Sequence, residues 1–294
     1  MRIVLLLTVL SLLAAGCGAA EVGEVAEPEQ AAAPSEDPGD ALYEATATVL
    51  EAPEGGPMLC LGPMLMSLPP QCGDIPIRGW SWDAVEGEQR HGGVRWGEFH
   101  VVGRYDGKTF ALVEAGPPRP LQAEPVEDLF VPPCPEPEGG WLAESAAVSQ
   151  SEVDEAEGYA RRQAEYVRSW VFHIDDPAAL EEGAYEEDQP VVYVAVFTSE
   201  AARHEAELRT RWAGPLCVVE RDVPSAREGA RIRADAEASL EELGLQMLSS
   251  WEGELGLAAE IEVVADPGGR GQAALDAHFG PGLVRLVPKL APVG

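Results

Sequence analysis

The chain of 294 residues carries 51 acidic and 20 basic side chains, which gives a formal net charge of −31. A field of this sign repels nucleic-acid phosphates and anionic lipid head groups, which argues against nucleic acid as a partner. The hydrophobic share of 46% is normal for a globular protein, and the length suffices for one large domain or two small ones. We therefore expect a folded, strongly acidic protein.

The first part of the chain has the pattern of an export signal, residues 1–16. Arg2 supplies a positive start, an apolar run follows, and small residues precede Cys17. The apolar run is too short to span a bilayer as a helix. Residues 13–17 (LAAGC) resemble the lipobox of bacterial lipoproteins, which implies cleavage after residue 16 and a diacylglycerol on the Cys17 sulfur. Two acyl chains suffice for stable anchoring. The alternative is ordinary secretion, with Cys17 in the cleaved peptide or in a disulfide.

Residues 17–40 are expected to form a disordered acidic spacer that carries the lipid anchor. Residues 18–40 have seven acidic side chains and no basic one, are rich in alanine, glutamate and proline, and show no apolar periodicity. A segment of this composition cannot bury enough apolar surface to fold. The spacer would let the folded part stand off the membrane.

Residues 41–116 have the pattern of a small all-β domain. Asp106-Gly107 suits a two-residue hairpin turn, because such a turn needs positive φ angles. Several short strands with turn residues between them are typical of a small barrel. The sequence therefore predicts a β-barrel-like domain, with an OB-like fold as the specific candidate. Strands are expected at residues 43–50, 75–82, 97–105 and 108–114.

An extended connector and an α/β domain are expected after residue 116. Residues 117–142 contain eight prolines, and Trp141 would anchor the end of this connector. In residues 143–294, helical periodicity alternates with short apolar runs, which indicates the order αβαβαββαβ and a mixed sheet with helices on one face. The whole chain is thus predicted to be α+β, and no internal repeat is evident. Helices are expected at residues 151–171, 199–212, 225–243 and 272–279, and strands at 191–197, 216–221, 245–251, 258–265 and 283–290.

The cysteines beyond the export signal indicate two disulfides. Cys60, Cys72, Cys134 and Cys217 are an even number in an exported chain, although sequence alone allows three connectivities. Cys60 and Cys72 enclose a loop rich in glycine and proline, which favours pairing them with each other. Cys134 and Cys217 would then hold the connector against a strand of the second domain.

The histidines form no recognised catalytic or metal-binding motif. His204-Glu205 begins H-E-x-x-H, but Leu208 occupies the position of the second zinc-binding histidine. His173 with Asp175-Asp176 is the best candidate for an acid–base pair, while a histidine at a helix C-terminus is the simpler interpretation. We expect His204 to be solvated and His278 to lie at a helix end. No metal site and no cofactor are expected.

Three methionines near Cys60 could act as soft ligands. Met58, Met64 and Met66 offer thioethers that suit Cu(I). Apolar packing in a β-domain with few other large residues explains them more simply.

Three tryptophans are the candidate ligand platform of the first domain. Trp80 and Trp82 lie on one face of an expected strand, and Trp96 lies in the next strand region. Paired indoles stack on sugar rings or seat a partner protein. The alternative is that they fill the core of a small barrel.

Several short motifs carry a family resemblance: residues 59–62 (LCLG), 69–72 (PPQC), 79–83 (GWSWD), 96–103 (WGEFHVVG), 133–141 (PCPEPEGGW), 211–217 (RWAGPLC) and 279–282 (FGPG). On these motifs the mature chain resembles exported proteins and lipoproteins of actinobacteria. The resemblance implies no catalytic residue, because the group has no assigned activity. The last βαβ unit also resembles pro-regions of secreted bacterial serine proteases, which implies a foldase or inhibitor role as a distant alternative.

These patterns together predict a lipid-anchored protein on the extracytoplasmic face of the cell membrane. We expect it to bind an unknown protein or saccharide ligand without catalysing a reaction. Its membrane contact would be made through the N-terminal lipid. The alternative is a cell-envelope hydrolase whose catalytic residues are scattered in sequence.

Overall fold

The computed structural model describes residues 41–73, 75–120, 131–144, 149–174, 190–254 and 256–293. The predicted export signal and acidic spacer lie outside these ranges. Within the described ranges, no helix is both long enough and apolar enough to cross a membrane. The described part contains α-helices and three β-sheets, which confirms the α+β class.

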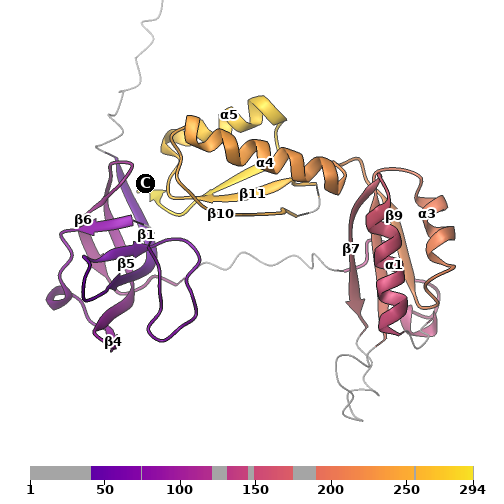
Figure 1. The fold of residues 1–294 in the computed structure, drawn as a ribbon, viewed down its shortest axis with the longest axis horizontal. Coiled ribbons are helices and arrows are strands. Elements are labelled where there is room, and N and C mark those ends of the chain that lie inside the picture. Colours follow the sequence, from indigo (N-terminus) through magenta and orange to yellow (C-terminus); the bar gives the residue numbers. More distant parts are fainter. Residues whose placement is uncertain are drawn as a thin grey trace, which may run out of the picture. The chain divides into compact units, whose positions relative to one another are not determined.

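The first sheet combines N-terminal strands with one short strand from the C-terminal end of the chain (Figure 1). Its members are β1 (Leu42–Glu51), β2 (Met58–Cys60), β3 (Ile75–Arg78), β4 (Gln89–His91), β5 (Val94–Tyr105), β6 (Phe110–Gly116) and β13 (Ala291–Pro292). The strand order is β13-β1-β2-β3-β6-β5-β4, and β1 also pairs with β5 along its whole length. β3 and β6 run parallel, whereas the other pairs are antiparallel.

The core of the first sheet includes side chains from both ends of the described chain. Alternate residues of β1 and β5, such as Val49 and Phe99, point into it, because successive side chains of a strand face opposite sides. Val264, Ala265 and Leu290 from the C-terminal part are buried in the same cluster. The N-terminal sheet and the C-terminal part therefore share apolar contacts.

Strand β3 is shorter than the predicted strand 75–82. It ends at Arg78, and Gly79 follows with a φ of +81°, a conformation that favours glycine. Trp82 consequently lies in a short 3-10 helix, η1 (Trp82–Ala84), and not on a strand face with Trp80.

The predicted hairpin is present, but its turn is longer than two residues. Tyr105 of β5 pairs with Phe110 of β6, so four residues connect the strands. The Asp106 carboxylate accepts hydrogen bonds from the backbone N–H groups of Lys108 at 2.9 Å and Thr109 at 2.7 Å. An aspartate side chain that caps its own turn stabilises this longer connection.

Among the described residues, the second half of the chain contains two segments with one topology, α-β-β-α-β, which is an internal repeat that the sequence does not reveal. In each segment the middle strand lies between an antiparallel first strand and a parallel third strand. The described residues also include the 3-10 helices η2 (Trp141–Glu144) and η4 (Pro267–Gly269). The first repeat contains α1 (Gln150–Arg162), β7 (Tyr166–His173), β8 (Val191–Phe197), α3 (Ala201–Leu208) and β9 (Leu216–Glu220). The second repeat contains α4 (Ala226–Glu242), β10 (Met247–Trp251), β11 (Ala259–Val263), α5 (Arg270–Phe279) and β12 (Val284–Pro288).

The expectation of one mixed sheet in this half is therefore wrong, because two three-stranded mixed sheets are present. Helices cover one face of each sheet (Figure 1). Side chains of α1 and of the α3 region pack on β8, and side chains of α4 and α5 pack on β11. The one-sided arrangement of helices thus holds for each sheet separately.

The predicted helix 151–171 is wrong in its second half. The helix ends at Arg162, and residues 166–173 (YVRSWVFH) form β7. This stretch is rich in aromatic and β-branched residues, which favour strands, and β8 offers it a partner. The helical start is well defined, because Ser149 and Glu152 form a capping box.

Strand β8 is buried on both faces, as its continuous apolar run predicts. Tyr193 and its alternate neighbours contact the helices of the first repeat. Val192 and Val194 face the opposite side, where Cys134 and Trp141 of the connector pack against them. The connector thus covers the sheet face opposite to α1 and α3.

The cysteines form disulfides in the two pairs that the sequence predicts, Cys60–Cys72 and Cys134–Cys217. The second bond joins the connector to β9. It closes a loop with a sequence separation of 83 residues, against 12 for the first bond.

The ends of two predicted helices differ from expectation. Ser199, the first residue of the expected helix 199–212, lies before α3, and Glu200 takes its N-cap position with a φ of 58°. The helix ends at Leu208, before the expected Trp212. Leu243, the last residue of the expected helix 225–243, is exposed just past the end of α4.

Candidate functional site

The three predicted platform tryptophans pack mainly in the core of the first sheet. Trp82 and Trp96 are buried, and Trp80 is half-buried. The ring centroid of Trp80 lies 5.3 Å from that of Trp82 and 4.9 Å from that of Phe99, in edge-to-face contacts. The Trp82 indole N–H donates to the Glu51 carboxylate at 2.5 Å. Trp80 and Trp82 pack against each other and against Phe99, and the three tryptophans do not form an exposed platform.

The methionines divide between the core and the surface. Met58 lies half-buried in β2, while Met64 and Met66 are exposed in the loop that follows. Cys60 is engaged in its disulfide and offers no thiolate to a metal. Apolar packing, the simpler expectation, is therefore wrong for Met64 and Met66.

His204 is fully buried, which corrects the expectation that it is solvated. Its ring stacks on Phe197 with centroids 3.8 Å apart. Nδ1 lies 3.0 Å from the Tyr159 hydroxyl, and Nε2 lies 3.1 Å from the Arg203 guanidinium. Because arginine can only donate, Nε2 must accept, and the imidazole is neutral. Burial, followed by the charge of Arg203, holds the pKa of His204 below its ordinary value.

Acidification is expected to destabilise the fold through His204. The unfolded chain binds a proton on this residue near pH 6.5, whereas the folded chain binds it only at lower pH. The free energy of unfolding should therefore fall as the pH drops below about 6.5, by at most about 1.4 kcal/mol per pH unit. Urea unfolding between pH 7.5 and 5.5 measures this slope.

The matched variants of this test are His204→Gln and His173→Gln. The first removes the buried imidazole and should flatten the slope, although it also lowers overall stability. The second replaces an exposed histidine of β7 and should keep the slope. A wild-type slope that survives His204→Gln would assign the pH dependence to other groups.

None of the pockets found in the described part of the chain is lined by His100, His173 or His278, so these histidines form no catalytic pair there. His173 lies in β7, not at a helix end, and residues 175–176, its proposed acidic partners, lie outside the described residues. His100 Nε2 lies 3.3 Å from a Glu44 carboxylate oxygen, and its Nδ1 lies 3.4 Å from the Thr46 hydroxyl. His278 is exposed near the end of α5, as expected. Among the described residues, no group of three His, Cys, Asp or Glu side chains could hold a metal ion.

The main candidate site is a groove between the two repeats, where β7 approaches the end of β10; we call it the inter-repeat groove. Its volume of about 570 Å³ lies within the range of small-molecule sites. Its lining combines aromatic side chains with charges of both signs. The residues that matter most are Tyr166, Arg168, Trp170, Trp251, Glu252 and Arg285.

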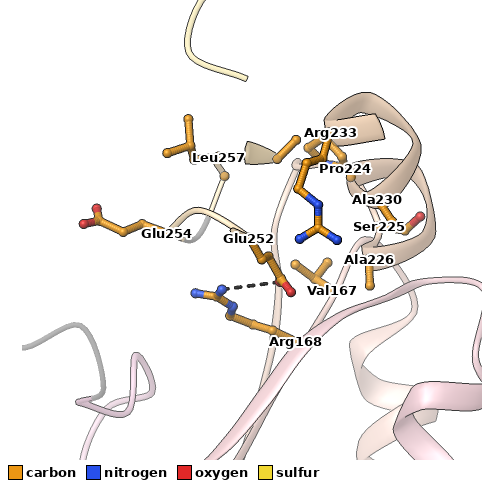
Figure 2. Close-up of a pocket in the computed structure, with 13 residues that line it drawn as sticks. Val167, Arg168, Pro224, Ser225, Ala226, Ala230, Arg233, Glu252, Glu254 and Leu257 are labelled. Carbon is orange, nitrogen blue, oxygen red and sulfur yellow. Dashed lines mark hydrogen bonds and ion pairs between the residues drawn. The ribbon is translucent and has the colours of Figure 1, made fainter. Parts of the chain in front are cut away.

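A smaller hollow adjoins this groove at the N-terminal turn of α4 (Figure 2). In Figure 2 the Arg233 side chain extends from α4 toward Val167 and Glu252. The hollow has a volume of about 60 Å³, which is enough for a few water molecules and too small for an organic ligand. We therefore regard it as an extension of the groove and not as a second site.

Arg168 connects the two repeats across the groove. Its guanidinium donates to the backbone carbonyl of Gly253 at 2.9 Å and lies 3.4 Å from the Glu252 carboxylate (Figure 2). On the facing sheet, Arg285 forms ion pairs with Glu260 and with Glu254, the latter at 3.7 Å. The charges of the groove are thus paired, which fixes their positions without closing the space between them.

A half-buried carboxylate network adjoins the groove at Tyr166 and Ser169. Glu157 of α1 accepts hydrogen bonds from Ser169 and from the Tyr193 hydroxyl, the latter at 2.9 Å. Burial raises the pKa of Glu157, but the hydrogen bonds from Ser169, Tyr193 and Arg161 outweigh it and hold the pKa below its usual range. The Tyr166 hydroxyl lies 2.8 Å from the Ser169 hydroxyl. This network holds the β7 side of the groove in one arrangement.

The sequence did not single out this groove. Trp170 and Trp251 lie in two different repeats, and residue 170 fell within an expected helix. Only a strand assignment for residues 166–173, with alternation of its side chains, would have pointed to this face. No protein-family model matches the chain, and neither the curated proteins nor the solved structures contain a significant match.

Proposed function

We propose that the chain is a lipid-anchored protein of the extracytoplasmic membrane face that binds a ligand in the inter-repeat groove without transforming it. The observation that carries this proposal is the lining of the groove. Trp170 and Trp251 offer apolar ring surface, and paired arginines and glutamates lie beside them. Ring faces stack on sugars, and fixed charged groups orient hydroxyls, so a saccharide is the ligand class we favour.

The anchor supplies the context of the proposed function. The lipobox-like segment before Cys17 would attach the chain by two acyl chains, and the spacer up to residue 40 would hold the folded part near the membrane surface. The resemblance to actinobacterial lipoproteins agrees with this placement. A protein held there would meet envelope polymers at high local concentration.

We further infer that the first sheet is an OB-like barrel. The pairing of β1 with β5 supports this, because the neighbours then run in a cycle, β1-β2-β3-β6-β5-β1. The parallel pairing of β3 with β6 is compatible with the Greek-key order of five-stranded OB barrels.

The alternative, a cell-envelope hydrolase, has one supporting observation. The Ser169 hydroxyl lies at the groove wall and donates to Glu157. The described residues that line the groove include no histidine to act as the base of a triad. A carboxylate whose pKa is held low is also a weak base, so we favour binding over hydrolysis.

The test is binding of soluble glycan fragments of the cell envelope to the purified protein, measured by calorimetry. Trp251→Ala is expected to weaken binding by roughly tenfold or more, because it removes an exposed aromatic contact of the groove. Met247→Ala is the control, since Met247 lies exposed on the same strand outside the groove lining.

Two outcomes would contradict the proposal. Equal loss of affinity in Trp251→Ala and Met247→Ala would move the site away from the groove. Release of shortened glycan products, abolished by Ser169→Ala, would favour the hydrolase.

A further inference from the structure

The loop between β2 and β3 carries a cluster of exposed large apolar side chains. Met64, Leu65, Met66 and Leu68 have exposed fractions of 39%, 64%, 104% and 69%. All four lie within five consecutive residues, although large apolar side chains usually avoid such exposure together. We call residues 61–71, which the Cys60–Cys72 bond closes, the apolar loop.

The apolar loop is held in shape by its own bonds. The Cys60–Cys72 disulfide closes its base, and Leu65 and Gln71 form a bridge with an N–H···O distance of 3.1 Å. The Ser67 hydroxyl donates to the Pro69 carbonyl at 2.7 Å and accepts from the Gln71 side-chain amide at 3.2 Å. The apolar side chains are therefore presented by a braced loop.

The loop also lacks charge in a chain that is strongly acidic. Residues 55–73 contain no Asp, Glu, Lys, Arg or His, whereas the chain as a whole has a net charge of −31. Three prolines at positions 63, 69 and 70 carry no backbone N–H, which lowers the free energy needed to remove the loop backbone from water. Of the polar side chains at the tip, those of Ser67 and Gln71 are bonded to the loop itself.

We propose that the apolar loop inserts into the interfacial region of the lipid bilayer. A protein partner would be recognised through hydrogen bonds as well as apolar contact, at about one bond per 100–200 Å². The apolar loop offers few such groups, while a bilayer interface requires apolar side chains and a backbone with few unmet N–H groups. The loop is a projection and not a groove, which suits entry into a fluid layer.

This inference rests on the proposed lipid anchor for its setting. Residue 17 and residue 41 are separated by 24 residues, so the spacer spans at most about 80 Å when extended. A tethered loop meets the membrane at high effective concentration, and weak insertion is then enough to orient the folded part. Acyl chains and loop would act as two membrane contacts of one protein.

The test uses the chain from Gly18 onward, without an acyl group, and phosphatidylcholine vesicles. This chain retains every residue that the structure describes, so its result does not depend on acylation. Sedimentation with vesicles should show partitioning that is insensitive to salt. The double variant Leu65→Ser with Met66→Ser should weaken partitioning by roughly tenfold.

Val113→Ser is the matched control, because Val113 is an exposed apolar residue of β6 outside the loop. It should partition like the unchanged chain. All three proteins should give the same thermal unfolding curve, since each substitution is exposed. Absence of binding by the unchanged chain, or equal binding by the loop variant, would overturn the proposal. Self-association through the loop, seen as a dimer that the double variant abolishes, would also overturn it.

Discussion

Replacing both Cys134 and Cys217 by alanine is expected to lower the free energy of unfolding by about 4.5 kcal/mol. The bond closes a loop with a sequence separation of 83 residues, and its loss returns that conformational freedom to the unfolded chain. The same change releases the connector from the sheet face of Val192 and Val194. Water would then reach a strand that is buried on both sides.

The matched control is the double replacement of Cys60 and Cys72 by alanine. This bond closes a separation of only 12 residues, for which the same entropy relation gives about 3 kcal/mol. Urea unfolding, followed by circular dichroism, measures both variants. We also expect the Cys134/Cys217 variant to expose β8 to hydrogen exchange. A larger loss in the Cys60/Cys72 variant would contradict the role assigned to the connector.

Exchanging residues 1–17 for a secretory leader without a lipobox is expected to release the protein from the membrane. Two buried acyl chains hold a protein almost permanently, whereas the apolar loop alone gives reversible contact. The ratio of membrane-bound to soluble protein should therefore fall by more than about a hundredfold. Cell fractionation with quantitative immunoblotting provides the measurement.

The control for this exchange is the native leader with the loop variant Leu65→Ser and Met66→Ser. That protein should remain in the membrane fraction, because its acyl chains are intact. An exchanged-leader protein that stays membrane-bound in high salt would show that something other than the Cys17 lipid holds it.

The elements that sequence predicted well have one dominant local signal. Strand β8 coincides with its continuous apolar run, and α4 begins directly after Ser225, whose hydroxyl accepts from the Glu228 backbone. Both disulfides follow from counting cysteines in an exported chain and from the small loop between Cys60 and Cys72. Such signals do not depend on distant contacts.

The errors occur where tertiary partners decide the structure. Residues 166–173 continue a helical apolar stripe, yet they pair with β8. His204 looked solvated because acidic residues surround it in sequence, although its ring packs on Phe197. The β4–β5 hairpin went unpredicted, even though Gly92-Gly93 supplies both positive φ angles of a two-residue turn.

The internal repeat leaves no pattern in the sequence for a physical reason. The two sheets share a topology but differ in what covers their second face. In the first repeat the connector covers the second face of the sheet, and the residues of β8 on that face, Val192 and Val194, are accordingly apolar. In the second repeat Glu260 and Glu262 occupy the second face of β11 and pair with basic side chains of the C-terminal segment. Because the second face of β8 is buried and that of β11 carries paired charges, the two repeats have different sequences although they share one topology.

The inter-repeat groove could not be predicted for a related reason. Its aromatic residues, Trp170 and Trp251, are 81 positions apart and lie on strands of different repeats. Both line the groove that Arg168 crosses to reach the Gly253 carbonyl, and no spacing rule anticipates this contact. The predicted tryptophan platform had a clear sequence pattern, but its residues serve the core of the first sheet.

The most direct test of the proposed membrane anchor, on which the placement of the protein depends, is the intact mass of the protein extracted from the membrane fraction. The account predicts a chain that begins at Cys17 and carries a diacylglycerol on its sulfur. A chain that begins at another residue, or one that begins at Cys17 with an unmodified thiol, would contradict it.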